Sequence, residues 1–191
     1  MSNKRMRTKV DELLSYGMSK QQVFDLVVEE FPEVKPGKVA EHVRYRPTLW
    51  SRERYRTAHR GLLALIVCSA LWRVIDAVME HGMKLDQATA YVALVPIASI
   101  LLGYVILQWH GQVFEWVGWG NVLSAFGLFK GFRTLVEEGS DHGVLALKVM
   151  AVAIGALSLY LARKVFAKPM QQKDPMGQAP PRYVFTDEGM G

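Results

Sequence analysis

The chain has 191 residues, of which 50% are hydrophobic, and a formal net charge of +5. Residues 1–60 hold thirteen Lys or Arg against eight Asp or Glu, which accounts for the whole net charge. The single cysteine, Cys68, excludes an internal disulfide and a cysteine-based metal cluster. A basic N-terminal part followed by an apolar remainder indicates a membrane protein rather than a soluble domain.

Residues 1–47 carry the pattern of three short helices. The first covers about residues 4–15 and ends before Gly17. Ser19 opens the second, because its hydroxyl and Gln22 form a capping box. Pro36 begins the third helix, which ends near Tyr45. We therefore predict a small cytoplasmic helical head over residues 1–47.

The stretch LLSYGMSKQQVFDLV followed by KPGKVAEHV resembles a helix-turn-helix motif. The resemblance implies DNA binding, with the third helix in the major groove. That helix offers Lys38, Glu41, His42 and Arg44 rather than a set of side chains suited to reading bases. Glu41 and its acidic neighbours would also repel phosphates, whose contacts dominate nucleic-acid affinity. Nucleic acid is therefore disfavoured as a partner.

Residues 48–60 form a juxtamembrane segment in which arginines alternate with aromatic residues. Basic groups near an anionic leaflet contribute about 1 kcal/mol each, and Trp and Tyr favour the headgroup level. We expect one helical stripe to carry Arg52, Arg56 and Arg60 and to continue without a break into the apolar run at residue 61. The predicted membrane-surface residues, which would contact anionic lipid headgroups, are Arg44, Arg46, Trp50, Arg52, Arg54, Tyr55, Arg56 and Arg60.

Residues 61–167 contain four apolar segments, at about 61–79, 88–107, 113–135 and 143–162. The second has twenty residues without an ionisable group and covers roughly 30 Å as a helix, the thickness of a bilayer core. Short connections predict antiparallel neighbours. The predicted fold is an all-α, up-down bundle of four transmembrane helices. Basic residues concentrate before the first segment and after the last. In a bacterial inner membrane this distribution places both termini on the cytoplasmic side.

Small residues recur at helical spacing in three of the four segments. Association of helices in lipid depends on close backbone approach, which small side chains permit. We predict packing seams at Ser99, Gly103, Gly120, Ser124, Gly127, Gly131, Ala151 and Gly155. Several copies joined along such a seam would give a homo-oligomer.

Six charged residues fall in one layer near the outer end of the predicted bundle: Arg73, Asp76, Glu80, Lys130, Arg133 and Lys148. Intramembrane charges mark either function or structural pairing. We favour ion pairs of Lys148 with Asp76 or Glu80, because no acidic residue lies at the bilayer midplane, where an ion pathway would need one. An outward-facing vestibule is the alternative.

Residues 168–191 are rich in Pro, Gln and Gly and predict a flexible cytoplasmic tail. Its run RYVFTDE contains β-formers, which could add a strand to a partner's sheet or lie on the head.

The sequence holds no phosphate-binding glycine loop, paired cysteines or metal-binding histidine motif, so neither an enzyme nor a cofactor or metal site is predicted. The favoured interpretation is a non-enzymatic adaptor or scaffold that recruits a cytoplasmic protein partner. The alternatives are an oligomeric channel, transporter subunit or membrane-disrupting effector, and a membrane-anchored DNA-binding regulator.

Overall fold

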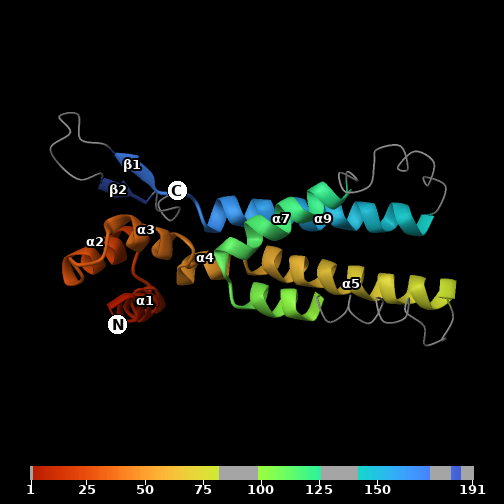
Figure 1. Ribbon diagram of the computed structural model, residues 1–191, viewed down its shortest axis with the longest axis horizontal. Coiled ribbons are helices and arrows are strands. Elements are labelled where there is room, and N and C mark those ends of the chain that lie inside the picture. The colour runs from red at the N-terminus through yellow and green to blue at the C-terminus, as the bar shows by residue number, and fades with distance from the viewer. Residues whose placement is uncertain (1, 82–98, 126–141, 173–181, 186–191) are drawn as a thin grey trace. The chain divides into compact units, whose positions relative to one another are not determined.

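The computed structural model of the protein describes residues 2–81, 99–125, 142–172 and 182–185 (Figure 1). These residues are mostly helical, which confirms the predicted helical class, and they include two short strands. The chain divides into two compact units. We call residues 1–56 and 161–191 the head unit, and residues 57–160 the apolar unit.

Three helices form the centre of the head unit: α1 (Ser2–Ser15), α2 (Lys20–Glu30) and α3 (Pro36–Arg44) (Figure 1). The predicted capping box is confirmed. The Ser19 hydroxyl oxygen accepts the Gln22 N–H at 3.2 Å, and Gln22 Oε1 accepts the Ser19 N–H at 3.1 Å. Pro36 begins the third helix as predicted, because its missing N–H costs nothing in a first helical turn.

The turn between α1 and α2 depends on Gly17, whose φ is 84°. The Gly17 N–H donates to the Leu14 carbonyl and the Met18 N–H to the Leu13 carbonyl. These two bonds are the Schellman arrangement, which satisfies the last carbonyls of a helix and favours glycine in the left-handed conformation. A single residue therefore ends α1 and redirects the chain so that α2 packs back on α1.

The core of the head unit joins the three helices to the far end of the chain. Its members from the helices recur at helical spacing, so each helix turns one apolar face inward. The buried cluster consists of Met6, Val10, Leu14, Val23, Phe24, Val27, Val34, Val39, Ala40, Val43 and Phe185. Phe185 is separated from the others by the whole apolar unit in sequence.

A fourth helix, α4 (Leu49–Arg54), follows with Thr48 as its N-cap, and α5 (Arg56–His81) begins only after Tyr55. The predicted unbroken stripe is therefore wrong. Arg52 lies on α4, whereas Arg56 and Arg60 lie on α5. The break occurs at Tyr55, whose ring is buried and whose φ and ψ of −97° and 12° depart from the helix.

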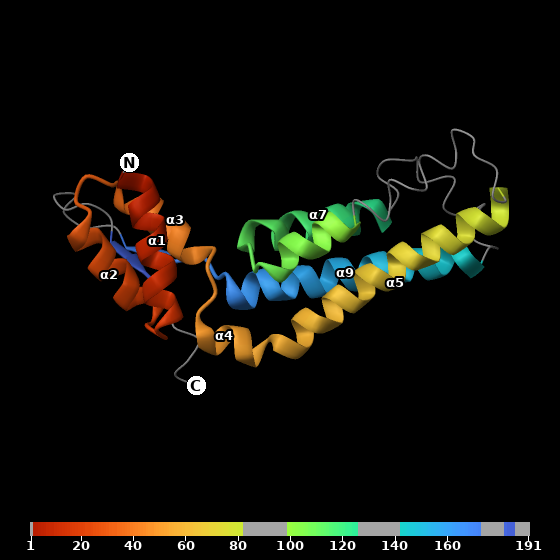
Figure 2. The ribbon, with the colours of Figure 1, turned by 90° about the horizontal axis from the view of Figure 1, so that it is seen from below.

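The tail forms strands β1 (Met170–Gln172) and β2 (Arg182–Val184), which pair antiparallel with Met170 opposite Val184. Both lie beside α2 and α3 in Figures 1 and 2. The predicted flexible tail does not hold for these residues and Phe185, whereas the alternative that the RYVF run lies on the head does. Burial of the Phe185 ring in the head core, with Tyr183 packed beside it, stabilises the segment.

The apolar unit contains α5, helical residues 99–107, α7 (Gly111–Ala125) and most of α9 (His142–Val165). Two stretches, Arg56–Ile75 and Ala146–Val165, are long and apolar enough to cross a membrane by length and composition, with mean hydropathy of 1.5 and 1.6. Each overlaps a predicted span. Most of the predicted span at 88–107 and the second half of that at 113–135 lie outside the described residues.

Helices α7 and α9 pack closely where Gly118 of α7 faces Gly155 of α9. A Cβ on Gly155 would lie 3.1 Å from the Gly118 carbonyl oxygen, and one on Gly118 would lie 2.6 Å from Leu159 Cγ. The predicted seam residue Gly155 therefore lies at a close contact between α7 and α9, and Ala151 is buried. Gly118 was missed because its neighbours at 120 and 124 gave the more regular spacing.

The other predicted seam glycines that the structure describes show no comparable close contact. Among the described residues, a Cβ on Gly103 or Gly120 would meet nothing within 4 Å, so a packing role for these two glycines stays a prediction. Ser99 is half-buried and Ser124 is exposed, while Gly127 and Gly131 lie outside the described residues. The sequence shows which small residues recur at helical spacing, but it does not show which side of each helix meets a neighbouring helix.

A buried histidine connects α5 to the turn before α7, a contact that the sequence did not suggest. His59 Nε2 lies 3.0 Å from the Ile106 carbonyl oxygen, and the His59 ring stacks on Trp109 at 4.0 Å between centroids. Trp109 has a φ of 56°, in the left-handed region. Phe114, fully buried, lies against both rings. The stack therefore holds a strained residue in place.

We expect Trp109→Gly to be less destabilising than Trp109→Ala. Both lose the ring, at about 3 to 5 kcal/mol for a buried aromatic, but only alanine keeps the left-handed strain of about 1 kcal/mol. Thermal unfolding in detergent measures the difference. Trp116, exposed on α7, is the matched control: there alanine should be the more stable by about 1 kcal/mol, because glycine weakens a helix. An alanine advantage at position 109 would contradict the role of the strain.

Candidate docking sites on the head unit

An extended segment, Tyr183–Phe185, packs against α2 and the first turn of α3. We call the surface that it covers, formed by Gln21, Phe24 and Gly37, the groove. The Phe185 ring packs against Phe24 with centroids 5.7 Å apart, and Tyr183 meets Phe24 edge-on at 5.8 Å. The Phe185 N–H donates to Gln21 Oε1 at 2.9 Å. The groove therefore binds both aromatic rings and a backbone amide of the segment.

The first turn of α3 is shaped to admit Tyr183. A Cβ on Gly37 would lie 3.0 Å from the Tyr183 hydroxyl oxygen, so a side chain at this position would press on the tyrosine. The hydroxyl also accepts a hydrogen bond from Gln171 Nε2 at 3.3 Å. In helix-turn-helix proteins the start of the recognition helix contacts the bases. In this protein Tyr183 lies against the first turn of α3.

Two cations of the head bind the end of α9. Lys20 Nζ donates to the Val165 carbonyl at 2.8 Å, and Arg44 Nε donates to the Phe166 carbonyl at 3.1 Å. Cations at a helix C-terminus satisfy its last carbonyls and complement the helix dipole. Phe166 itself is fully buried, with Lys20 Nζ 5.7 Å from its ring centroid. The tail therefore enters the head at a fixed point.

The predicted membrane-surface residues divide into two groups. Arg44 contacts Phe166 and lies over the Tyr45 ring at 4.5 Å, and Arg46 Nε pairs with Asp11 Oδ1 at 2.9 Å. These arginines stabilise the head, and Tyr55 is buried, so the prediction of a surface role is corrected for all three. The exposed members are Trp50, Arg52, Arg54, Arg56 and Arg60. Among them, the Arg54 guanidinium lies 4.7 Å from the Trp50 ring centroid.

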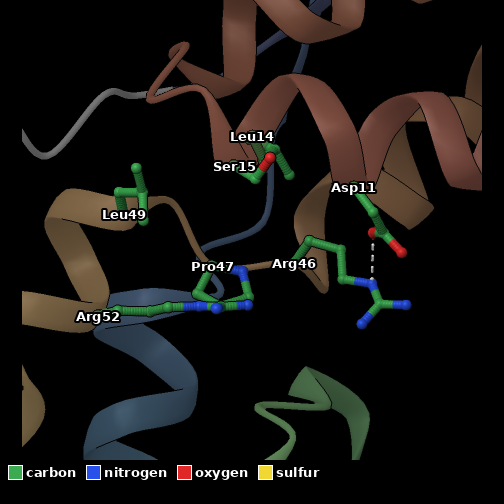
Figure 3. A pocket seen from close by; sticks show the side chains of 7 residues that line it. All are labelled: Asp11, Leu14, Ser15, Arg46, Pro47, Leu49 and Arg52. Atoms are coloured by element: carbon green, nitrogen blue, oxygen red, sulfur yellow. Dashed lines mark ion pairs between the residues drawn. The ribbon is translucent and has the colours of Figure 1, made fainter.

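Figure 3 shows a second candidate site, a pocket of ≈ 180 Å³ on the head. Arg52 extends beside Pro47 on one side, and the ion pair of Asp11 with Arg46 closes the other. The remaining lining residues are Leu14, Ser15 and Leu49. Ligand sites for cofactors usually occupy about 300 Å³ or more, so this pocket suits a single side chain or a small ion.

The predicted charge layer falls largely outside the described residues. Arg73 is exposed on α5 and Lys148 is half-buried on α9. The backbone of Asp76 and Glu80 lies in α5, but their side chains, and all of Lys130 and Arg133, lie outside what the structure describes. The pairing of Lys148 with Asp76 or Glu80 stays a prediction.

The groove was missed at the sequence level, although one signal pointed to it. In the run RYVF, alternation places Tyr183 and Phe185 on the same face of a strand, which indicates a strand with one buried face. No local signal marks Gln21 or Gly37 as their partners, because these lie on ordinary helical positions. Within the described ranges, no three His, Cys, Asp or Glu side chains gather as metal ligands.

No family model, no curated protein and no solved structure matches the chain. Its function has to be inferred from its own residues.

The head should lose stability as the pH falls below about 6.5, the ordinary pKa of histidine. His42, on α3, lies 3.8 Å from Asp11, yet burial lowers the pKa of its imidazole, with Arg46 and Arg7 acting in the same direction against the Asp11 and Glu41 carboxylates. The unfolded chain therefore binds a proton at a pH where the folded head does not. The contribution is present above pH 6.5 and is lost as the pH falls toward the lowered folded value.

Hydrogen exchange of the α3 amides across this pH range, corrected for intrinsic rates, measures the loss. In the His42→Gln variant the dependence should be flatter. An unchanged pH profile in that variant would show that another group is responsible.

Proposed function

We propose that this protein is an integral membrane adaptor without enzymatic activity, whose head recruits a cytoplasmic protein partner. In this proposal four helices cross a bacterial inner membrane in an up-down bundle, and both termini lie in the cytoplasm. The described parts of α5 and α9 would supply two of the spans. The residues at 88–107 and 113–135 would supply the others.

The observation that supports membrane insertion is the exposure of large apolar side chains on the apolar unit. Ile100 is 70% exposed and Trp116 80% exposed, and Leu71 lies open on α5. A soluble protein rarely exposes a contiguous apolar surface beyond a few hundred Å². In the head unit, by contrast, the large apolar residues of α1, α2 and α3 mostly face inward. Lipid is the medium in which the exposed side chains would be favourable.

The start of α5 supports an interfacial position. Arg56 and Arg60 are exposed at the beginning of the Arg56–Ile75 stretch, and Trp50 and Arg54 form an exposed cation–π pair just before it. Arginines beside tryptophan are favoured at the headgroup level, where the cation meets lipid phosphates. Anionic headgroups are therefore the expected partners of this segment.

The adaptor role is supported by the way the head binds chain segments. Its groove binds an extended aromatic segment, and its cations bind a helix end, both through side chains of α2 and α3. These are contacts by which one protein recognises another. No contact in the described part of the chain favours the channel or the DNA-binding alternative.

The single cysteine provides a direct test of membrane insertion. Cys68 is exposed on α5, twelve residues after Arg56, or about 18 Å along the helix. In native vesicles we expect a membrane-impermeant maleimide to leave Cys68 unlabelled, because lipid excludes the reagent from the thiol. Unfolding in detergent should then expose it.

The matched control carries Cys68→Ser together with Tyr16→Cys, at a position 74% exposed on the head. This variant should be labelled in inside-out vesicles and protected in right-side-out vesicles, as a cytoplasmic head requires. Equal labelling of Cys68 and the control in inside-out vesicles would reject the insertion of α5.

A further inference from the structure

We propose that the groove on the head is a peptide-docking site and that Tyr183–Phe185 is its tethered occupant. A partner would dock by displacing this segment with an extended peptide of its own that carries aromatic side chains at alternate positions. The proposal rests on the adaptor role and names the surface through which it would act.

The groove recognises an aromatic-x-aromatic pattern in an extended backbone. Tyr183 and Phe185 both contact Phe24 of α2, while Val184 between them points the other way and is exposed. Gln21 Oε1 binds the backbone N–H of the second aromatic residue, a group that any peptide offers. Gly37 leaves the space for the first ring. Ring spacing would therefore set specificity, and the residue between the rings is free to vary.

The occupant is held by few contacts outside the groove. Within the described residues, β2 pairs in a sheet with β1 alone, and β1 has three residues that are all exposed. An isolated two-stranded ribbon is at best marginally stable in water. The remaining core comes from residues 6–43, with Val10, Val27 and Val39 fully buried among their neighbours. The segment could therefore leave while the three helices stay packed.

Tethering would make the groove selective for partners that bind well. A segment attached through a short linker competes at an effective concentration in the millimolar range. A weak peptide in free solution would not displace it. A partner held beside the same membrane, or one that also pairs with the edge of β1, would do so.

The test uses the full chain in detergent and a fluorescent peptide with the sequence of residues 182–187. The variant Tyr183→Ser/Phe185→Ser removes the tethered rings, and Val184→Ser is the matched control on the outer face. We expect the double variant to bind the peptide at least tenfold more tightly than the wild type or the control. Adding Phe24→Ala should abolish binding, as should replacing both aromatic residues of the peptide by serine.

Three results would overturn the proposal. The double variant could fail to bind the peptide at millimolar concentration, it could bind no better than the wild type, or its head could unfold without being restored by the peptide. Circular dichroism of each variant, with and without peptide, separates these outcomes. Restoration of an unfolded head by the peptide would support docking in trans.

Hydrogen exchange of the wild type provides a second measurement that needs no variant. If the segment leaves without unfolding the head, the Phe185 amide should be protected at least tenfold less than the Val27 amide in the middle of α2. Equal protection would mean that the segment opens only with the whole head and is not exchangeable. None of these measurements requires a membrane, so failure here leaves the proposed membrane insertion untouched, and failure of Cys68 protection leaves the groove untouched.

Discussion

The apolar unit depends on a medium that covers its outward-facing side chains. Only 17% of the Arg56–Ile75 stretch and 33% of the Ala146–Val165 stretch are buried within the protein. Burial of one large aliphatic or aromatic side chain contributes about 1.5 to 3 kcal/mol, and a typical fold is stable by about 5 to 15 kcal/mol. Leaving several such side chains in water would forgo as much free energy as the whole fold retains. The proposed lipid environment removes that deficit.

In lipid the helices gain nothing from apolar burial against one another, so closer contacts must hold them together. The backbone approach at Gly118 and Gly155 and the His59 contact with the Ile106 carbonyl provide such contacts. The head follows the opposite principle, because its valines and Phe24 gather inside as in a water-soluble domain. Phe185 completes that core from the far end of the chain. The segment that closes the head is thus also the one a partner would replace.

The sequence was informative where structure is decided locally. The Ser19 capping box, the start at Pro36 and the turn at Gly17 depend on residues within one or two helical turns, and all three were predicted. Prediction failed where the local structure depends on contacts between residues that are distant in the sequence. Burial of Tyr55 interrupts the expected helical stripe, and Arg46 pairs with Asp11 across the head. For the groove, the aromatic alternation was visible, but its partners on α2 and α3 were not.

What covers the exposed apolar faces can be measured at Trp116, the most exposed large apolar side chain among the described residues. A photoreactive amino acid placed there and activated in native membranes attaches to its nearest neighbour, which mass spectrometry identifies. The account predicts an adduct with lipid acyl chains. An adduct with water or with a soluble protein, and no lipid, would contradict the central claim that this unit is embedded in the bilayer.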